Sequence, residues 1–286
     1  MTESSGKTRL TQLRRLLTAA YVFVFCRPSA QKFNDLLLHL TMRGRGYNLG
    51  PHPEKTGEAK FIRRFALTNP MLCVDIGANQ GTYSRLLLEH TGAHVIAFEP
   101  LPKSFESLKE IEDAFPGRFT PVNVGVGERD ETLTLNYGEA STLASFSSAV
   151  SEIDFVGSAN VSSVDVPVVS LDSYFARSAH QYREVDLLKI DTEGFEFEVL
   201  SGARHTISEL RPKFIQIEFN WHQLFRGHSM RDLSHLLPGY SLYQLLAHGT
   251  GLARRDWNTP EANFYSFSNF VFVRDDVVSS GIMNRG

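Results

Sequence analysis

Residues 71–81, Met-Leu-Cys-Val-Asp-Ile-Gly-Ala-Asn-Gln-Gly, constrain the fold of this chain more than any other stretch. An apolar run ends at Ile76, a turn bounded by Gly77 and Gly81 follows, and residues 83–89 have the composition of a helix. Glycines let the backbone turn sharply and approach a ligand closely. A strand, a glycine turn and a helix in this order predict the entry to a nucleotide-type site in an α/β sheet.

An acidic residue follows this turn at an informative distance. The apolar run at residues 94–98 ends at Glu99, about 20 residues after the turn, where dinucleotide-binding folds place the carboxylate that holds ribose hydroxyls. An ordinary βαβ crossover with a glycine turn and a surface glutamate is the alternative. Asp75 and Glu99 at these two spacings favour the ligand site.

The turn has the form Gly77-x-Asn79-x-Gly81, whereas dinucleotide binders use three glycines that seat a pyrophosphate on a helix N-terminus. Asp75 lies just before the first glycine, where its carboxylate would repel a pyrophosphate but suit a ligand with a cationic or amine-bearing part. S-adenosylmethionine is such a ligand, since it combines a ribose, a sulfonium and an amino-acid tail.

The rest of the chain alternates apolar runs with amphipathic segments, which is typical of an α/β fold. Further strands are predicted at residues 119–124, 131–136, 164–169, 185–190, 213–219, 240–246 and 269–273, and helices at residues 31–43, 59–67, 105–115, 171–175, 195–200 and 231–237. Ser104 is the expected N-cap of the helix at 105–115. Residues 131–136 and 164–169 are expected to pair as a hairpin, and a second hairpin with a long loop at 249–268 is expected to close the sheet.

The strand at residues 185–190 leads directly into two further carboxylates, Asp191 and Glu193. In doubly wound folds, ligands bind beyond the carboxyl ends of the strands. Asp191 and Glu193 are therefore expected to face the same cleft as Asp75 and Glu99. Glu196 falls in the first turn of the following helix, where an interaction with the helix dipole and a role in the cleft are both open.

Residues 1–68 are predicted to form an N-terminal helical cap, and residues 69–286 the catalytic domain. Basic residues followed by the apolar run at 16–26 imitate a signal peptide, but Arg27 stands where a small-x-small cleavage site would follow. The run is also shorter than the ~20 apolar residues that a membrane-spanning helix needs. A helix docked on the domain, a dimer contact that gives a homo-oligomer, and a peripheral membrane contact through residues 10–26 remain as alternatives.

Net charge and cysteine content limit the kinds of partner and the cellular compartment that we expect for this protein. The net charge is −3, so no broad electrostatic field favours nucleic acid. The two cysteines offer neither a disulfide framework nor metal-finger spacing, which indicates a cytoplasmic protein, with association at the periphery of a membrane left open. Residues 137–163, rich in Ser, Ala and Gly, are either a flexible surface loop or a substrate loop.

Two blocks of sequence carry a resemblance to a known family: Val-Asp-Ile-Gly-Ala-Asn-x-Gly at residues 74–81 and Leu-Lys-Ile-Asp-Thr-Glu-Gly-Phe-Glu at residues 188–196. Ala-Phe-Glu-Pro at 97–100, Val-Ser-Leu-Asp-Ser-Tyr at 169–174 and Gly57-Glu58 add to it. The chain resembles the FkbM family of S-adenosylmethionine-dependent methyltransferases. The resemblance implies a Rossmann-like seven-stranded sheet, mostly parallel with the last strand antiparallel. It also implies methylation of a hydroxyl, commonly on a sugar or a secondary metabolite.

The predicted contacts with S-adenosylmethionine gather at the ends of the first strands. They are Asp75, Gly77, Ala78, Asn79, Gly81, Thr82, Glu99, Asn123 and Asp191. Asp75 and Asn79 are expected at the amino-acid end of the ligand, Glu99 at both ribose hydroxyls, and Asn123 at the adenine.

Methyl transfer requires the acceptor oxygen close to the methyl carbon and opposite the sulfur, so positioning supplies much of the rate. A sugar hydroxyl holds its proton tightly and also needs a general base or a metal. The candidate catalytic residues are Asp191, Glu193, Glu218 and His222. Glu193 or His222 is the preferred base, with a structural His222 and a paired Glu218 as alternatives. Asp191, Glu193 and Glu218 together could hold a divalent metal ion, since hard cations prefer oxygen ligands.

The sequence thus favours an O-methyltransferase whose acceptor is a small molecule or a glycan, such as a sugar in a polysaccharide, a glycolipid or a glycosylated metabolite. Two other classes stay open. One is an NAD-type oxidoreductase, against which Asp75 and the missing third glycine argue. The other is a membrane-associated protein that binds the cofactor without catalysis.

Overall fold

The computed structural model forms two compact units, Met1–Tyr47 and Asn48–Gly286. It describes residues 2–138, 146, 162–177, 182–248 and 251–280, with side chains from residue 11 onward. Most of the predicted substrate loop at 137–163 lies outside the described residues. Among the described residues, no helix is both long enough and apolar enough to cross a membrane.

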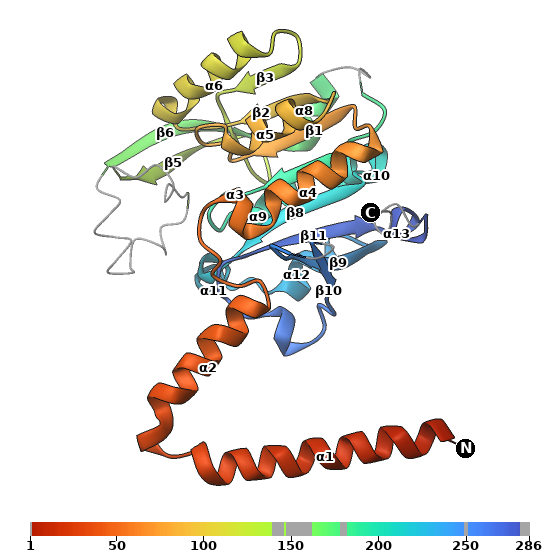
Figure 1. Ribbon diagram of the computed structural model, residues 1–286. Coiled ribbons are helices and arrows are strands. Elements are labelled where there is room, and N and C mark those ends of the chain that lie inside the picture. The colour runs from red at the N-terminus through yellow and green to blue at the C-terminus, as the bar shows by residue number, and fades with distance from the viewer. Residues whose placement is uncertain (1, 139–145, 147–161, 178–181, 249–250, 281–286) are drawn as a thin grey trace. The chain divides into compact units, whose positions relative to one another are not determined.

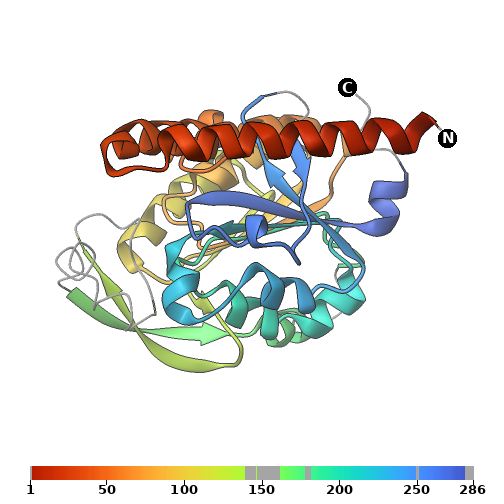
Figure 2. The same ribbon diagram turned by 90° about the horizontal axis from the view of Figure 1, so that it is seen from below.

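The first unit consists of two helices joined by a short 3-10 helix. They are α1 (Thr2–Phe25), η1 (Pro28–Ala30) and α2 (Gln31–Gly44), and α1 is continuous along its length (Figures 1 and 2). At the corner between them, the Tyr21 hydroxyl donates to Asn34 Oδ1 at 2.6 Å. The rings of Phe25 and Phe33 lie 5.0 Å apart at the same corner. The predicted helix at residues 31–43 is confirmed by α2.

The second unit begins before the predicted domain boundary at residue 68. It opens with α3 (Pro53–Thr56), α4 (Glu58–Phe65) and η2 (Ala66–Thr68). The apolar face of α4 places the Phe61 and Phe65 rings edge-on against Phe214, with centroids 5.7 and 5.6 Å away. Because this face is buried on the sheet, the residues from Asn48 onward belong to the same compact unit as the catalytic core.

The main sheet has eight strands in the order β10-β9-β11-β8-β7-β1-β2-β3 (Figure 1). They are β10 (Leu252–Arg254), β9 (Tyr240–Leu245), β11 (Ser268–Arg274), β8 (Phe214–Phe219), β7 (Leu187–Ile190), β1 (Leu72–Ile76), β2 (His94–Phe98) and β3 (Phe119–Val122). The strands from β8 to β3 pair in parallel, and β11 is antiparallel to both of its neighbours. The predicted mostly parallel sheet with an antiparallel last strand is confirmed.

The eighth strand is a departure from the predicted seven. β10 pairs antiparallel with β9 and lies inside the segment predicted as a loop at 249–268. The same segment contains the short helix η5 (Pro260–Ala262). A strand of only three residues carries too little alternation to be recognised from the sequence.

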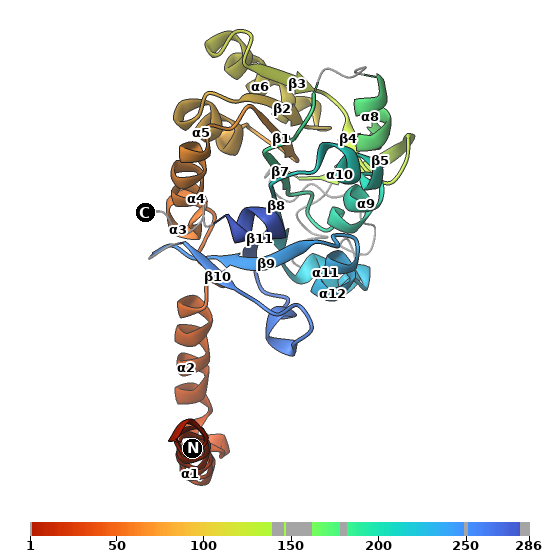
Figure 3. The ribbon, with the colours of Figure 1, turned by 90° about the vertical axis from the view of Figure 1, so that its right-hand side faces the viewer.

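Helices cover both faces of the main sheet. They are α5 (Thr82–His90), α6 (Pro102–Ala114), α8 (Leu171–Arg177), α9 (Glu196–Ser201), α10 (Arg204–Leu210), α11 (Trp221–Arg226), α12 (Met230–His235) and α13 (Asp275–Ser279). Figure 3 shows α4 and α5 on one face and α9 to α12 on the other. This is the doubly wound arrangement, in which the carboxyl ends of the parallel strands form one edge for a ligand.

A smaller sheet has the order β4-β6-β5. Its strands are β4 (Gly125–Val126), β5 (Glu131–Tyr137) and β6 (Ser162–Val169). β5 and β6 pair antiparallel from Glu131 opposite Val168 to Tyr137 opposite Ser162, which confirms the predicted hairpin. β4 begins three residues after β3 ends, so in the chain the small sheet follows directly on the edge strand of the large one.

The predicted N-cap of α6 is wrong. The helix starts at Pro102, with Leu101 as the extended N-cap residue, because proline is favoured at the first helical position, where no N–H is needed. Ser104 therefore lies within the first turn of the helix. Its hydroxyl donates to Asn79 Oδ1 at 3.1 Å, which links α6 to the glycine turn.

Candidate active site

A cavity of about 230 Å³ opens at the carboxyl ends of β1, β2, β7 and β8. Six of the predicted site residues line it: Gly77, Asn79, Glu99, Asp191, Glu193 and Glu218. These residues come from four neighbouring strand ends that are up to 141 positions apart in the chain. The predicted common cleft is therefore present, although not every predicted residue reaches it.

The glycine turn after β1 is fixed by its neighbours on both sides. The amides of Gly77 and Ala78 both donate to the carbonyl of Phe98 at 3.0 Å. Gly77 has φ 76°, and a Cβ at this position would lie 1.8 Å from the Asp191 carbonyl oxygen. Only glycine lets the ends of β1 and β7 come this close. Gly81, at φ 79°, likewise leaves room for Ile111 of α6.

Glu99 lies at the end of β2 with both carboxylate oxygens engaged by the backbone. Oε2 accepts from the Asn79 amide and Oε1 from the Leu101 amide, each at 2.8 Å. Burial raises the pKa of Glu99 to about 7, although these two amides oppose the rise. A carboxylate oxygen can accept more than one hydrogen bond, so Glu99 can still receive hydroxyls from a ligand in the cavity.

Three other predicted cofactor residues surround this strand end without lining the cavity. Asn123 is exposed, and its amide donates to the carbonyls of Glu99 at 2.8 Å and Pro100 at 3.2 Å. It therefore braces the backbone that carries Glu99, while Val124 beside it lines the cavity. Ala78 is buried within the turn, and Thr82 is the exposed first residue of α5.

Asp75, which the sequence predicts at the amino-acid end of the ligand, does not line the cavity. It is fully buried, it accepts a hydrogen bond from the Ser84 hydroxyl at 2.7 Å, and its Oδ1 lies 3.6 Å from Lys189 Nζ. Every residue of β1 is buried, so both faces of the strand lie inside the protein. Burial raises the pKa of Asp75, and the Lys189 cation opposes that rise.

Lys189 is the buried cation of the site. Its Nζ lies 2.9 Å from Asp191 Oδ2 and 3.6 Å from Asp75 Oδ1, so it forms ion pairs with both carboxylates. Burial alone would lower the pKa of Lys189, but the carboxylates of Asp191, Asp75 and Glu58 outweigh burial and raise it. Lys189 is thus held as a cation beneath the carboxylates of the cavity.

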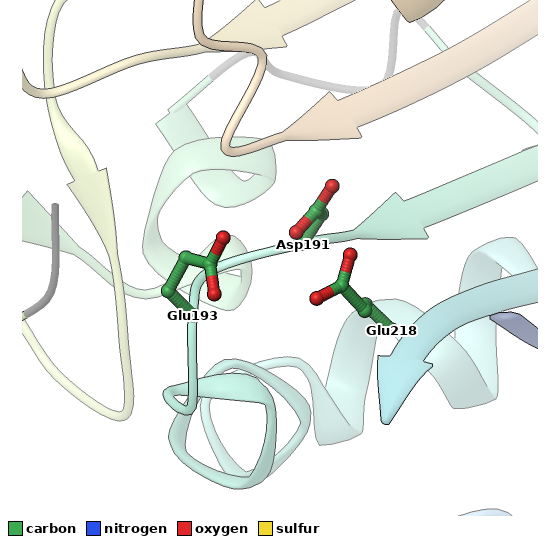
Figure 4. Close-up of side chains that lie close together, drawn as sticks. All are labelled: Asp191, Glu193 and Glu218. Carbon is green, nitrogen blue, oxygen red and sulfur yellow. The ribbon is translucent and has the colours of Figure 1, made fainter. Parts of the chain in front are cut away.

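Three carboxylates crowd the other half of the cavity (Figure 4). Asp191 directly follows β7, Glu218 lies near the end of β8, and Glu193 lies in the turn between them in sequence, at φ 52°. One oxygen from each lies within 4.8 Å of one oxygen from each of the others. Burial, followed by the charges of Asp191 and Glu193, raises the pKa of Glu218 well above its ordinary value. Lys189 offsets part of this repulsion, and a proton or a further cation would relieve more of it.

His222 lies behind Glu193. Its Nδ1 is 2.9 Å from Glu193 Oε2, and its side chain is 1% exposed and does not line the cavity. Burial raises the pKa of Glu193, and the hydrogen bond with His222 opposes that rise. His222 is therefore positioned to orient Glu193, so of the two candidate bases only Glu193 faces the cavity.

Glu196 has a larger part in the site than an interaction with the helix dipole. Its Oε1 accepts from the amides of Thr192 at 2.9 Å and Gly194 at 3.3 Å, and its Oε2 accepts from Gln223 Nε2. Burial raises the pKa of Glu196 to about 7. Glu196 thus fixes the turn that carries Glu193, which the sequence left open.

The sequence analysis did not identify the residue that hydrogen-bonds to Glu218, which is Asn220. Asn220 caps α11 and forms a capping box with Gln223. The Asn220 side chain also donates to Glu218 Oε1 at 2.6 Å. An Asn followed three residues later by Gln before a helix is a recognisable capping signal, so this element could have been found in the sequence.

Glu58 is a further carboxylate of the cavity that was not predicted as a site residue. It reaches the cavity from α4, and its Oε1 accepts from Gln216 Nε2 at 2.9 Å. The Tyr83 hydroxyl donates to the other side of the Gln216 amide at 2.6 Å. Burial raises the pKa of Glu58. The Gly57-Glu58 pair is part of the resemblance to the FkbM family, so the sequence contained a signal that could have identified Glu58 as a site residue.

A protein-family model matches the part of the sequence that carries this site. Residues 75–242, from β1 to β9, match the methyltransferase FkbM domain. The chain belongs to the FkbM methyltransferase family. The matched segment contains the glycine turn, Glu99 and all three crowded carboxylates, and it supports S-adenosylmethionine as the methyl donor. The NAD-type oxidoreductase interpretation is not supported.

Parts of this chain are similar to known proteins in sequence or in structure. It is 30% identical over 146 residues to the hexuronic acid methyltransferase AglP of Haloferax volcanii, a match that covers 50% of this chain and 54% of that protein. The chain thus spans about half the length of that relative. The O-methyltransferase from Bacillus cereus, solved in complex with SAH, is 11% identical with a TM-score of 0.44, and the match covers 91% of this chain and 97% of that one. The precorrin-6y C5,15-methyltransferase from Geobacter metallireducens has a TM-score of 0.40 at 11% identity, over 79% and 91% of the two chains.

Proposed function

We propose that this protein transfers the methyl group of S-adenosylmethionine to a hydroxyl of a sugar. One observation carries the proposal: the ribose-type carboxylate Glu99 and the crowded carboxylates Asp191, Glu193 and Glu218 line one cavity. A donor held by Glu99 would thus lie beside groups able to handle the proton of an acceptor. The hexuronic acid named for the Haloferax volcanii relative supports a sugar as the acceptor class.

The residues present fit S-adenosylmethionine. Glu99 retains acceptor capacity for the ribose hydroxyls, and its backbone partners Asn79 and Leu101 fix its orientation. Asp191 adjoins the glycine turn and lines the cavity, so we assign it to the amino-acid end of the ligand in place of the buried Asp75. When bound, S-adenosylmethionine supplies a methyl carbon activated by its sulfonium.

Glu193 is the proposed general base. It faces the cavity, its pKa is raised by burial, and His222 fixes its Oε2 from behind at 2.9 Å. A carboxylate with a raised pKa holds a proton more readily than an exposed one, which suits proton removal from a hydroxyl during methyl transfer. The turn held by Glu196 keeps this carboxylate in position before an acceptor arrives.

A divalent cation is the alternative way to activate the hydroxyl. Asp191, Glu193 and Glu218 offer three oxygen ligands within 4.8 Å of one another, the donor type preferred by magnesium and calcium. Such an ion would lower the pKa of an acceptor hydroxyl and relieve the repulsion among the carboxylates. Activity that disappears with a chelator and returns with added magnesium would favour the ion, whereas unchanged activity would favour Glu193 acting alone.

The proposal is tested by mass spectrometry of products. The full chain is incubated with S-adenosylmethionine carrying a deuterated methyl group and a panel of sugars, uronic acids and sugar nucleotides. We expect a mass increase of one labelled methyl on a sugar acceptor, and its loss in Glu193→Gln but not in Glu112→Gln, an exposed acid on α6. Binding of S-adenosylhomocysteine without labelling of any acceptor would instead favour a cofactor-binding protein without catalysis.

A further inference from the structure

The two compact units have opposite charge. The unit Met1–Tyr47 contains eight Lys and Arg against two Asp and Glu, which leaves twenty-one against thirty in the remainder of the chain. The net charge of −3 hides this division. A basic segment attached to an acidic enzyme indicates that the segment has an anionic partner of its own.

The helix α1 also exposes large apolar side chains. Leu16 is 69% exposed, Leu17 63% and Phe23 82%. The apolar run at 16–26 is shorter than the ~20 residues that span a bilayer, which leaves contact with a membrane surface as the way in which it could meet lipid. Apolar side chains exposed to this extent over one helix are typical of an interaction surface.

The second helix also exposes apolar side chains. In α2 no side chain is buried, and Leu36, Leu38 and Leu40 are more than half exposed. The aromatic contacts of Phe25 with Tyr21 and Phe33 lie at the corner between the helices. Tyrosine, as at Tyr21, is enriched at the boundary between lipid headgroups and acyl chains.

Basic side chains lie next to the apolar ones. Arg14 and Arg15 immediately precede Leu16 in α1 and are exposed, and Lys32 is exposed at the start of α2. A helix that combines leucine and phenylalanine with flanking arginine and lysine has the composition of a segment that binds an anionic lipid surface.

We propose that residues 11–44 bind the surface of an anionic bilayer, with the leucines and phenylalanines among the acyl chains and the basic side chains at the phosphates. A second copy of this chain is the other candidate for the apolar surface. It would bring two units of like charge together, which the eight basic residues of each copy disfavour. The inference does not depend on the proposed methyl transfer.

The test uses the full chain and sedimentation with vesicles. We expect binding to vesicles of phosphatidylglycerol and phosphatidylcholine, and little binding to phosphatidylcholine alone. The binding should weaken as salt rises from 0.1 to 0.5 M, because salt screens the attraction between arginine and lipid phosphates. Equal binding to both kinds of vesicle, or none to either, would overturn the proposal.

Two double variants separate the contributions of charge and apolar contact. Arg14→Gln with Arg15→Gln should weaken partition into anionic vesicles about tenfold or more, since each basic residue near such a surface contributes about fivefold. Leu16→Ala with Leu17→Ala, which preserves helix propensity, should weaken it by a similar factor. Lys103→Gln with Lys109→Gln, at two exposed positions of α6, removes the same charge and should leave partition unchanged.

Sedimentation velocity without lipid distinguishes the two candidate partners of the apolar surface, an anionic bilayer and a second copy of this chain. The proposal expects the same oligomeric state for the wild type and the Leu16→Ala, Leu17→Ala variant. A dimer that the leucine variant dissociates, together with vesicle binding that the arginine variant does not alter, would assign the surface to a second copy and overturn the membrane proposal. Methyl transfer to a freely soluble acceptor should be unchanged in both variants, so failure of one proposal is distinguishable from failure of the other.

Discussion

The two halves of the cavity differ in how well their polar groups are satisfied. At the ends of β1 and β2, the single carboxylate Glu99 accepts a backbone amide on each oxygen. At the ends of β7 and β8, Asp191, Glu193 and Glu218 lie within 4.8 Å of one another. The first half offers one carboxylate to the hydroxyl groups of a ligand, and the second half offers several carboxylate oxygens to a proton or a cation.

Under the proposed function, this difference means that ligand binding and methyl transfer are supported by different kinds of contact. The binding half relies on backbone geometry that only glycine permits, as Gly77 shows. The chemical half relies on side chains that orient other side chains, such as His222 behind Glu193 and Asn220 beside Glu218. Substitutions in the two halves should therefore fail in different ways.

The largest effect is expected for Gly77→Ala. A Cβ 1.8 Å from the Asp191 carbonyl would force β1 and β7 apart, and φ 76° adds strain for any other residue. The free energy of unfolding, measured with urea, should fall by about 4 kcal/mol or more. Gly92→Ala is the matched control, because its Cβ would meet nothing within 4 Å. Equal stability of the two variants would contradict the packing role of Gly77.

Glu193→Gln should separate chemistry from binding. Loss of the proposed base should lower kcat about 10²- to 10³-fold, while the Kd for S-adenosylhomocysteine stays within about twofold of the wild-type value. Glu112→Gln, at an exposed position of α6, removes the same charge outside the cavity and should leave both constants unchanged. A raised Kd for S-adenosylhomocysteine with an unchanged kcat would instead show that Glu193 acts in ligand binding.

Glu99→Gln should show the opposite pattern. Loss of a charged acceptor for the ribose should raise the Kd for S-adenosylhomocysteine about 10- to 100-fold. Because the pKa of Glu99 is about 7 in the free protein, the carboxylate is protonated below this pH and accepts hydroxyls poorly. Titration calorimetry should therefore show a Kd that falls as pH rises through 7 in the wild type and not in Glu99→Gln. A pH dependence shared by both proteins would assign it to another group.

The smallest effect is expected for His222→Asn. His222 acts only through Glu193, so kcat should fall about fivefold with an unchanged Kd for S-adenosylhomocysteine. The hydrogen bond from His222 lowers the pKa of Glu193, so its removal should raise that pKa and shift the acid limb of the activity profile to higher pH. A loss of kcat with no shift of the pH profile would indicate a merely structural role.

The sequence predicted the half of the site that depends on local order. The apolar run before Gly77, the turn and the distance to Glu99 all reside in one βαβ unit, and the strands on which they depend formed where the apolar runs lie. Parallel strand ends share one edge of the sheet, which brought Asp191 and Glu193 to the same cavity. These inferences needed only periodicity and topology.

The remaining features of the site could not be predicted, because they depend on which way a side chain points from its strand or helix. Because β1 is buried on both faces, alternation does not reveal that Asp75 points to Ser84 and Lys189 and away from the cavity. The position of His222 behind Glu193 depends on how α11 packs against the turn after β7, a contact between segments that α9, α10 and β8 separate in the chain. The place of α4 in the catalytic unit follows from Phe214, which is far away in sequence.

The most direct test of the central claim is a crystal structure of the protein with S-adenosylhomocysteine. The account predicts both ribose hydroxyls within hydrogen-bond distance of Glu99, with the sulfur turned toward the space between Asp191, Glu193 and Glu218. A ligand bound outside this cavity, or one whose ribose contacts neither oxygen of Glu99, would contradict it.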